Sequence, residues 1–160
     1  MPTFTTTESS KREEKVFSFL GKQWKCEFNH LGLYSPIDYW AVKDGRPVGW
    51  FELKSSKFKS KQSSYSLLLN TRKWVTLSTL KFSSPYPAFF VGCAELPDSY
   101  QIFWTKIEDI SASCNNWKVI DGRKARALPT SASPFTVKSD VEVCISINTS
   151  AMVCAGELAK

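Results

Sequence analysis

The strongest constraint on the fold is a pair of apolar, alternating segments, residues 37–42 and 48–54, separated by a short polar stretch. The connecting residues, Lys43-Asp44-Gly45-Arg46-Pro47, include an Asp-Gly pair of the kind favoured in tight turns between antiparallel strands. Alternation with period two is typical of strands that have one covered face. The sequence therefore predicts a β-hairpin over residues 37–54.

Two helices are predicted on either side of this hairpin. The first covers residues 9–20, with Ser9 or Ser10 as its N-cap, Gly21 as its stop, and one apolar side formed by Val16, Phe17 and Leu20. The second begins at Asn70 or Thr71 and ends at Ser83-Ser84-Pro85, and its apolar residues are Trp74, Leu77 and Leu80.

Further strands complete the predicted order of elements. They are expected at residues 23–28, 88–93, 100–107 and 141–147, with a loop over 29–35 and irregular structure over 115–134. The resulting order, α-β-β-β-α-β-β, indicates an α/β or α+β fold with a central mixed sheet flanked by helices. We expect a single domain over residues 1–160, with a core at about 9–107 and an extension, 108–160, packed on it.

Several function classes are excluded by residues that the sequence lacks. The chain has one histidine, His30, and its five cysteines form no C-x-x-C pair, which excludes common zinc and redox motifs. It has neither a glycine-rich phosphate loop nor a G-x-S-x-G elbow, so we expect no nucleotide cofactor. Residues 1–14 contain no apolar signal region, so we expect a cytoplasmic protein without a membrane partner.

Two acidic residues and a lysine fall on the predicted hairpin. Period-two geometry places Glu52 and Lys54 on one face of their strand. A three-residue turn that pairs Lys43 with Pro47 would place Asp38 directly opposite Glu52. A two-residue turn would put Asp38 on the other face, unless a bulge at Gly49 restored the register.

Asp38 and Glu52 side by side would repel each other unless a cation lies between them. Mg²⁺ suits such a pair because it binds one or two carboxylates and keeps several waters. A metal-bound water could then attack a phosphodiester while Lys54 orients it or neutralises the developing charge. The alternative is a salt-bridged strand edge, since E-x-K is a common triplet.

The segments Ile37-Asp38 and Phe51-Glu52-Leu53-Lys54 resemble the signature of the PD-(D/E)xK, or restriction-endonuclease-like, nucleases. The predicted order of elements is similar to the α-β-β-β-α-β core of that superfamily. The resemblance covers about residues 13–107, and small phage or prokaryotic nucleases, including junction resolvases, are the most similar kind. The chain differs from the motif in having Ile37 rather than proline directly before the aspartate.

This resemblance implies roles for individual residues. Asp38, Glu52 and the Leu53 backbone carbonyl would bind Mg²⁺ or Mn²⁺, and Lys54 would support the attacking water. An acid on the first helix often completes such sites. Glu13 is preferred to Glu14 for that role, because its spacing to Val16, Phe17 and Leu20 places it on the buried side of the helix.

Charge supplies an independent argument for a polyanionic partner. The formal net charge is +6, and no acidic residue lies between Leu53 and Ala94. A flexible loop over residues 55–62 is expected to grip the phosphate backbone, with Phe58 and Tyr65 available to stack on bases. The predicted nucleic-acid-binding residues are Lys57, Lys59, Lys61, Arg72 and Lys73. The alternative is an ordinary solvated loop.

These observations together predict a Mg²⁺- or Mn²⁺-dependent deoxyribonuclease, and a homodimer would suit cleavage of two strands or of a junction. RNA as a substrate, and attack from an end, fit the same residues. Two other classes stay open: a non-catalytic nucleic-acid-binding protein on the same scaffold, and a protein-interaction or virion-associated module. A second basic cluster, Arg123, Lys124 and Arg126, would extend the nucleic-acid track or be merely solvated.

Overall fold

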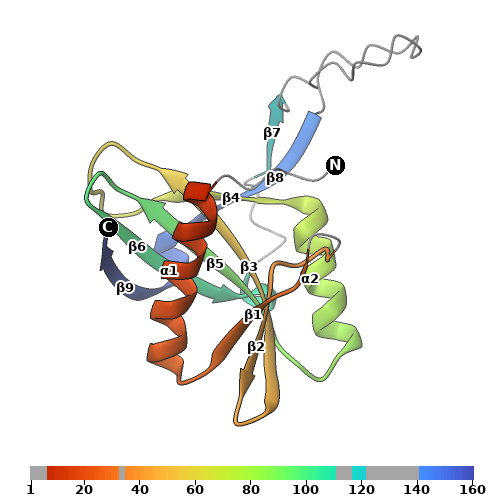
Figure 1. Ribbon diagram of the computed structural model, residues 1–160. Helices are drawn as coiled ribbons and strands as arrows, with labels where there is room; N and C mark the ends of the chain where they lie inside the picture. The colour runs from red at the N-terminus through yellow and green to blue at the C-terminus, as the bar shows by residue number, and fades with distance from the viewer. Residues whose placement is uncertain (1–6, 33–34, 111–116, 122–140) are drawn as a thin grey trace, which may run out of the picture.

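Two helices flank a mostly antiparallel sheet in the computed structural model, which describes residues 7–32, 35–110, 117–121 and 141–160 (Figure 1). The helices are α1 (Thr7–Trp24) and α2 (Thr71–Ser83), and the short 3-10 turns are η1 (Ile107–Asp109) and η2 (Thr149–Ala151). The strands are β1 (Glu27–His30), β2 (Tyr39–Lys43), β3 (Arg46–Lys57), β4 (Ser66–Asn70), β5 (Ala88–Glu95), β6 (Ser99–Lys106), β7 (Trp117–Asp121), β8 (Val141–Asn148) and β9 (Val153–Ala159). The predicted mixed α+β class is confirmed.

The main sheet has six strands in the order β1-β2-β3-β5-β6-β9. The β3–β5 pair is parallel, and the other neighbours are antiparallel. A second, three-stranded sheet has the order β4-β8-β7. Strands β4 and β9 were not predicted from the sequence, and the prediction that residues 117–121 are irregular is wrong, because they form β7.

Helix α1 covers one face of the main sheet. Its Val16, Phe17 and Leu20 are buried, as predicted, and they pack against Phe51 and Leu53 of β3. The predicted ends of this helix were wrong: Ser9 and Ser10 lie inside it, and it continues past Gly21 to Trp24. The chain leaves the helix at Lys25, whose φ is 54°, and the Cys26 N–H donates to the Gly21 carbonyl at 3.0 Å. Gly21 therefore does not end the helix, but its carbonyl accepts a hydrogen bond from Cys26, just past the helix end.

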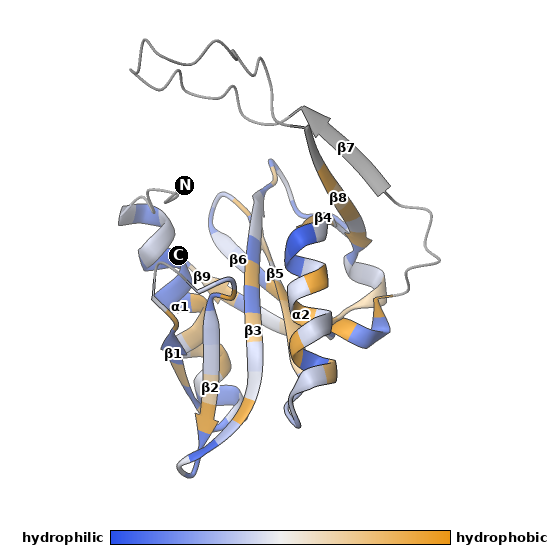
Figure 2. Cartoon of the chain, turned by 90° about the vertical axis from the view of Figure 1, so that its right-hand side faces the viewer, coloured by the Kyte–Doolittle hydropathy of each residue, from blue (hydrophilic) through white to orange (hydrophobic). Residues whose placement is uncertain are grey.

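Helix α2 lies on the opposite face (Figures 1 and 2). Its predicted N-cap is confirmed, because the Asn70 side chain accepts a hydrogen bond from the Arg72 N–H at 2.7 Å. Its predicted end is also confirmed, with Ser84 as the C-cap. Leu77 is buried in a core shared with β5 and with Leu67 and Leu69 of the smaller sheet. The smaller sheet and α2 thus cover the same face of the main sheet.

Other boundaries differ from the sequence predictions. The first strand is residues 27–30 rather than 23–28, so two residues of the predicted loop at 29–35 are strand. Strand β3 runs to Lys57, so the first three residues of the predicted flexible loop at 55–62 are strand as well. Long apolar β5 is buried along most of its length, as a strand covered on both faces should be. In the described part of the chain, no helix is long and apolar enough to cross a membrane.

Candidate active site

The hairpin between β2 and β3 sets the position of Asp38. Its turn has only two residues, Asp44 and Gly45, with φ values of 51° and 71°, as a type I′ turn requires. The predicted three-residue turn is therefore wrong. Val42 pairs with Pro47 and Ala41 pairs with Gly49, so Val48 is an extra residue in a bulge.

This bulge restores the register that the two-residue turn alone would lose. Tyr39 pairs with Phe51, the last pair of the ladder, and one further step places Asp38 beside Glu52. The alternative predicted for a two-residue turn, a bulge at Gly49 that restores the register, is close to what the hairpin contains, but the extra residue is Val48. Asp38, Glu52 and Lys54 consequently lie at the same end of the hairpin and on the face that α2 covers.

Glu52 is an unusual residue for a protein interior, because its side chain is 0% exposed. Two ammonium groups compensate its charge: Lys73 Nζ lies 3.1 Å from its Oε1 and Lys54 Nζ lies 3.5 Å from the same atom. Lys73 also donates a hydrogen bond to Oε2 at 3.1 Å. Within the described residues, Oε1 itself accepts no hydrogen bond.

The pKa of the Glu52 carboxyl is raised to about 7, chiefly by burial and in addition by the negative charge of Asp38. Lys54 and Lys73 act in the opposite direction without restoring the ordinary value. A carboxyl with a pKa close to neutrality beside a second carboxylate is a common property of functional sites.

Asp38 is half-buried, and its side chain makes a hydrogen bond to the backbone of β3 that a neighbouring strand would otherwise make. Its Oδ2 accepts a hydrogen bond from the Leu53 N–H at 3.3 Å. The N–H and C=O groups of one strand residue point toward the same side. The Leu53 carbonyl, predicted as a metal ligand, therefore faces the side of β3 on which Asp38 lies.

Lys73 reaches this site from the first turn of α2. Lys73 was predicted to bind nucleic acid. Its ammonium instead lies 3.8 Å from Asp38 Oδ1 and donates to the Pro36 carbonyl at 2.8 Å. A signal for this role was present in the sequence. The first turn of α2 carries no acid and two cations, which the helix dipole disfavours unless a nearby anion compensates them.

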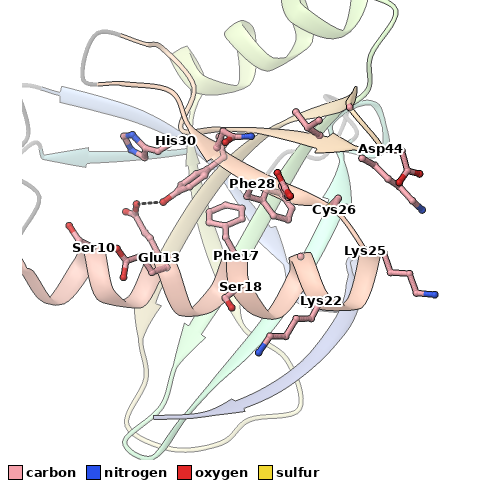
Figure 3. A pocket seen from close by; sticks show the side chains of 18 residues that line it. Ser10, Glu13, Phe17, Ser18, Lys22, Lys25, Cys26, Phe28, His30 and Asp44 are labelled. Atoms are coloured by element: carbon pink, nitrogen blue, oxygen red, sulfur yellow. Dashed lines mark hydrogen bonds between the residues drawn. The ribbon is translucent and has the colours of Figure 1, made fainter.

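Glu13 of α1 is half-buried, whereas Glu14 is exposed. Its Oε2 accepts a hydrogen bond from the Tyr39 hydroxyl at 3.3 Å. Burial and the charge of Asp38 raise the pKa of Glu13 above its usual range. Glu13 and His30 lie at the same end of a cleft of about 1250 Å³ between α1 and the strands β1 and β2 (Figure 3).

The donors of this site are suited to a hard divalent cation. No cluster of three or more His, Cys, Asp or Glu side chains with metal-binding geometry occurs in the described ranges, so Glu13 is not close enough to complete one. Two carboxylates and a backbone carbonyl nevertheless match the ligands of Mg²⁺, which keeps several waters. The Glu52 Oε1 atom, buried without a hydrogen bond, is the observation that favours this fit.

The predicted nucleic-acid-binding residues have different surroundings. Lys57, Lys59 and Arg72 are exposed, whereas the Lys61 ammonium pairs with Glu157 of β9 at 3.0 Å. The prediction that Tyr65 stacks on bases is wrong, because it is 1% exposed and its ring packs 4.7 Å from that of Phe58. Phe58 is itself partly buried in the core. The basic cluster at residues 123–126 lies outside the described residues.

No protein-family model, curated protein or solved structure matches this chain.

Proposed function

We propose that this chain is a divalent-metal-dependent nuclease that hydrolyses DNA phosphodiester bonds, with a core similar to that of the PD-(D/E)xK nucleases. The observation that carries the proposal is a fully buried Glu52 beside Asp38, with Lys54 two residues further along the same strand. An internal glutamate with a pKa near 7 has a large energetic cost, which a binding or catalytic role would explain.

The order of elements supports the same core. Helix α1, the three strands β1 to β3, helix α2 and β5 follow one another along the chain, with β4 as an insertion. The parallel pairing of β3 with β5 brings the strand with Glu52 and Lys54 to the middle of the sheet. A restriction-endonuclease-like topology is therefore part of the proposal.

In this proposal Asp38, Glu52 and the Leu53 carbonyl hold Mg²⁺ or Mn²⁺. A bound metal would lower the pKa of a water and polarise a phosphoryl oxygen. The water oxygen forms a bond to phosphorus, one P–O ester bond breaks, and the leaving oxygen takes a proton. Lys54, whose side chain is 40% exposed, can reach the attacking water from the solvent side while staying 3.5 Å from Glu52.

DNA would lie against the exposed cations that flank the site. Lys57 and Lys59 follow Lys54 along the chain, and Arg72 precedes Lys73 at the start of α2. Cations that flank an active site hold the phosphate backbone without reading sequence. The preferred form of DNA then depends on shape rather than on base contacts.

A gel assay tests this function directly. Supercoiled plasmid, linear duplex, single strand and four-way junction are incubated with Mg²⁺, Mn²⁺ or EDTA, with wild type and Lys54→Ala side by side. Metal-dependent products that disappear in Lys54→Ala, and persist in the exposed control Lys106→Ala, are the expected result. Equal cleavage by Lys54→Ala would refute the site.

One observation favours a second function, a non-catalytic nucleic-acid-binding protein on the same scaffold. Lys73 already provides a positive charge at 3.1 Å from Glu52 and 3.8 Å from Asp38, where a catalytic metal would have to bind. In that case the same assay yields salt-sensitive retention of DNA and no product with either metal.

A further inference from the structure

The single ammonium group of Lys73 lies against oxygens of three residues. Its Nζ lies 2.8 Å from the Pro36 carbonyl, 3.1 Å from Glu52 and 3.8 Å from Asp38 Oδ1. The side chain is 27% exposed, so its charge is partly shielded from water. An oxygen cage of two carboxylates and a carbonyl is the environment that a hard cation prefers.

Lys54 does not share this position. Its Nζ approaches only Glu52 among the described carboxylates, at 3.5 Å, and its side chain is more exposed, at 40%. Lys54 therefore lies beside the carboxylate pair, whereas Lys73 contacts both members of it.

The helix that carries Lys73 offers no other reason for a cation there. Position 73 lies in the first turn of α2, where the free N–H groups and the dipole favour negative charge. The ion pairs with Glu52 and Asp38 compensate this unfavourable placement. Without an ammonium at this point, two neighbouring carboxylates would repel each other across the end of the hairpin.

We propose that Lys73 is the resident cation of the carboxylate pair: it holds Asp38 and Glu52 together before metal binds, and a divalent metal must displace it. The inference rests on the proposed metal site. Because the ammonium and the metal compete for the same oxygens, loss of Lys73 raises metal affinity and lowers the stability of the metal-free protein. Lys73 is thus a positioning residue that sets the metal concentration at which the site fills.

The test compares wild type with Lys73→Met, using Mn²⁺ as the probe and no DNA. Free Mn²⁺ is measured by electron paramagnetic resonance during titration, and thermal unfolding is followed with and without Mn²⁺. We expect Lys73→Met to bind Mn²⁺ about tenfold more tightly or better, since one competing charge is gone. We also expect a lower midpoint of unfolding without metal, and a smaller deficit at saturating Mn²⁺.

Lys81→Met is the matched control. Lys81 is on the same helix, its side chain is 29% exposed, and it pairs with Glu108 at 3.3 Å, away from the site. Its loss should leave Mn²⁺ affinity unchanged. Lys73→Arg keeps the charge, so it should bind Mn²⁺ more weakly than Lys73→Met, and it serves as the comparison if the methionine variant fails to fold.

The readouts separate this inference from the nuclease function. Tighter Mn²⁺ binding by Lys73→Met supports the inference even if no variant cleaves DNA. Equal or weaker Mn²⁺ binding by Lys73→Met overturns it, including the case in which neither protein binds Mn²⁺, and it does so even if wild type cleaves DNA. For Lys73→Arg, an affinity equal to that of wild type supports competition by charge, and an affinity tenfold higher overturns it.

Discussion

Asp38 accepts a hydrogen bond through its Oδ2 from the backbone N–H of Leu53, at 3.3 Å. The ladder between β2 and β3 ends one residue earlier, at the pair Tyr39 and Phe51. Asp38 lies just before β2 begins, so its side chain, not its backbone, makes the hydrogen bond to β3 at this position. This contact holds Asp38 beside Glu52, on the face of β3 that also carries Lys54.

The first prediction uses Asp38→Asn, which keeps an oxygen acceptor for Leu53 and removes the charge. We expect cleavage to fall by about 100-fold or more, because a metal ligand and its charge are lost. The free energy of unfolding should change by less than about 1 kcal/mol, since the hydrogen bond can be retained. Rates from the gel assay and urea unfolding measure the two quantities.

The matched control for this variant is Asp98→Asn, in an exposed turn between β5 and β6. It removes the same charge far from the metal ligands and should leave cleavage unchanged. An equal loss in both variants would mean that net charge, not the position of Asp38, sets the rate.

A second prediction concerns the pH dependence of stability in the absence of metal. The pKa of Glu52 is about 7 in the folded protein, against an ordinary value of 4.5. Between these two values the folded state binds one more proton than the unfolded state, so the contribution of Glu52 to stability falls as pH rises. The loss is nearly complete at pH 8 and amounts to about 3 kcal/mol.

Glu52→Gln isolates this effect, because the amide has the same shape and does not titrate. Urea unfolding of both proteins at pH 5 and pH 8 gives the difference in free energy of unfolding at each pH. As pH rises from 5 to 8, wild type should lose stability relative to Glu52→Gln. A difference that is independent of pH would show that the carboxyl of Glu52 titrates normally.

The hairpin illustrates how far the sequence could predict the site. The strands, the Asp-Gly turn and the shared face of Glu52 and Lys54 all follow from local patterns. The position of Asp38 depended on a choice between two registers, and a one-residue change reverses the face of every side chain. Only the three-dimensional pairing shows that Val48 is the extra residue.

Contacts between distant segments were harder to predict. Lys73 lies 21 residues from Glu52 along the chain, and its direction depends on how α2 packs over the sheet. Strand β4 is only five residues long and is followed directly by α2. Its apolar residues therefore cannot be told from the first turn of a helix by pattern alone. Tyr65 was mistaken for a surface aromatic because its surroundings come from distant parts of the chain. Its backbone N–H donates to the Thr149 hydroxyl at 2.8 Å, 84 positions away, and its side chain packs in a cluster with Leu96 and Phe103.

A third prediction separates exposed cations from paired ones in DNA binding. Lys59 and Arg72 are exposed, whereas the Lys61 ammonium is paired with Glu157 at 3.0 Å. Each cation that neutralises a phosphate adds about 0.9 to the slope of log affinity against log salt. Lys59→Ala and Arg72→Ala should each lower that slope by about this amount.

Lys61→Ala is the internal control, since Glu157 already neutralises this ammonium and its loss should leave the slope nearly unchanged. Fluorescence anisotropy of a labelled duplex between low and moderate salt measures all three variants. Identical slopes for all of them would assign the DNA-binding surface to another part of the chain.

The last prediction tests how the smaller sheet is joined to the strand that carries the site. Gly92 of β5 pairs with Lys54 of β3, and a Cβ at Gly92 would overlap the Cδ1 atom of Leu67 on β4. Gly92→Ala should therefore cost about 1–3 kcal/mol through overpacking. Leu67→Ala should cost about 2–5 kcal/mol because it leaves a cavity beneath the smaller sheet.

The double variant is the decisive measurement for this contact. The methyl group of Ala at position 92 would occupy part of the space left by Leu67. The double variant should therefore lose less free energy of unfolding than the sum of the losses in the two single variants. Gly32→Ala is the control, because a Cβ at Gly32 meets no atom within 4 Å, and it should change stability by less than about 0.5 kcal/mol. Strict additivity would show that Gly92 and Leu67 do not interact. The packing of β4 against β5 would then not be what holds β5 in place beside Lys54.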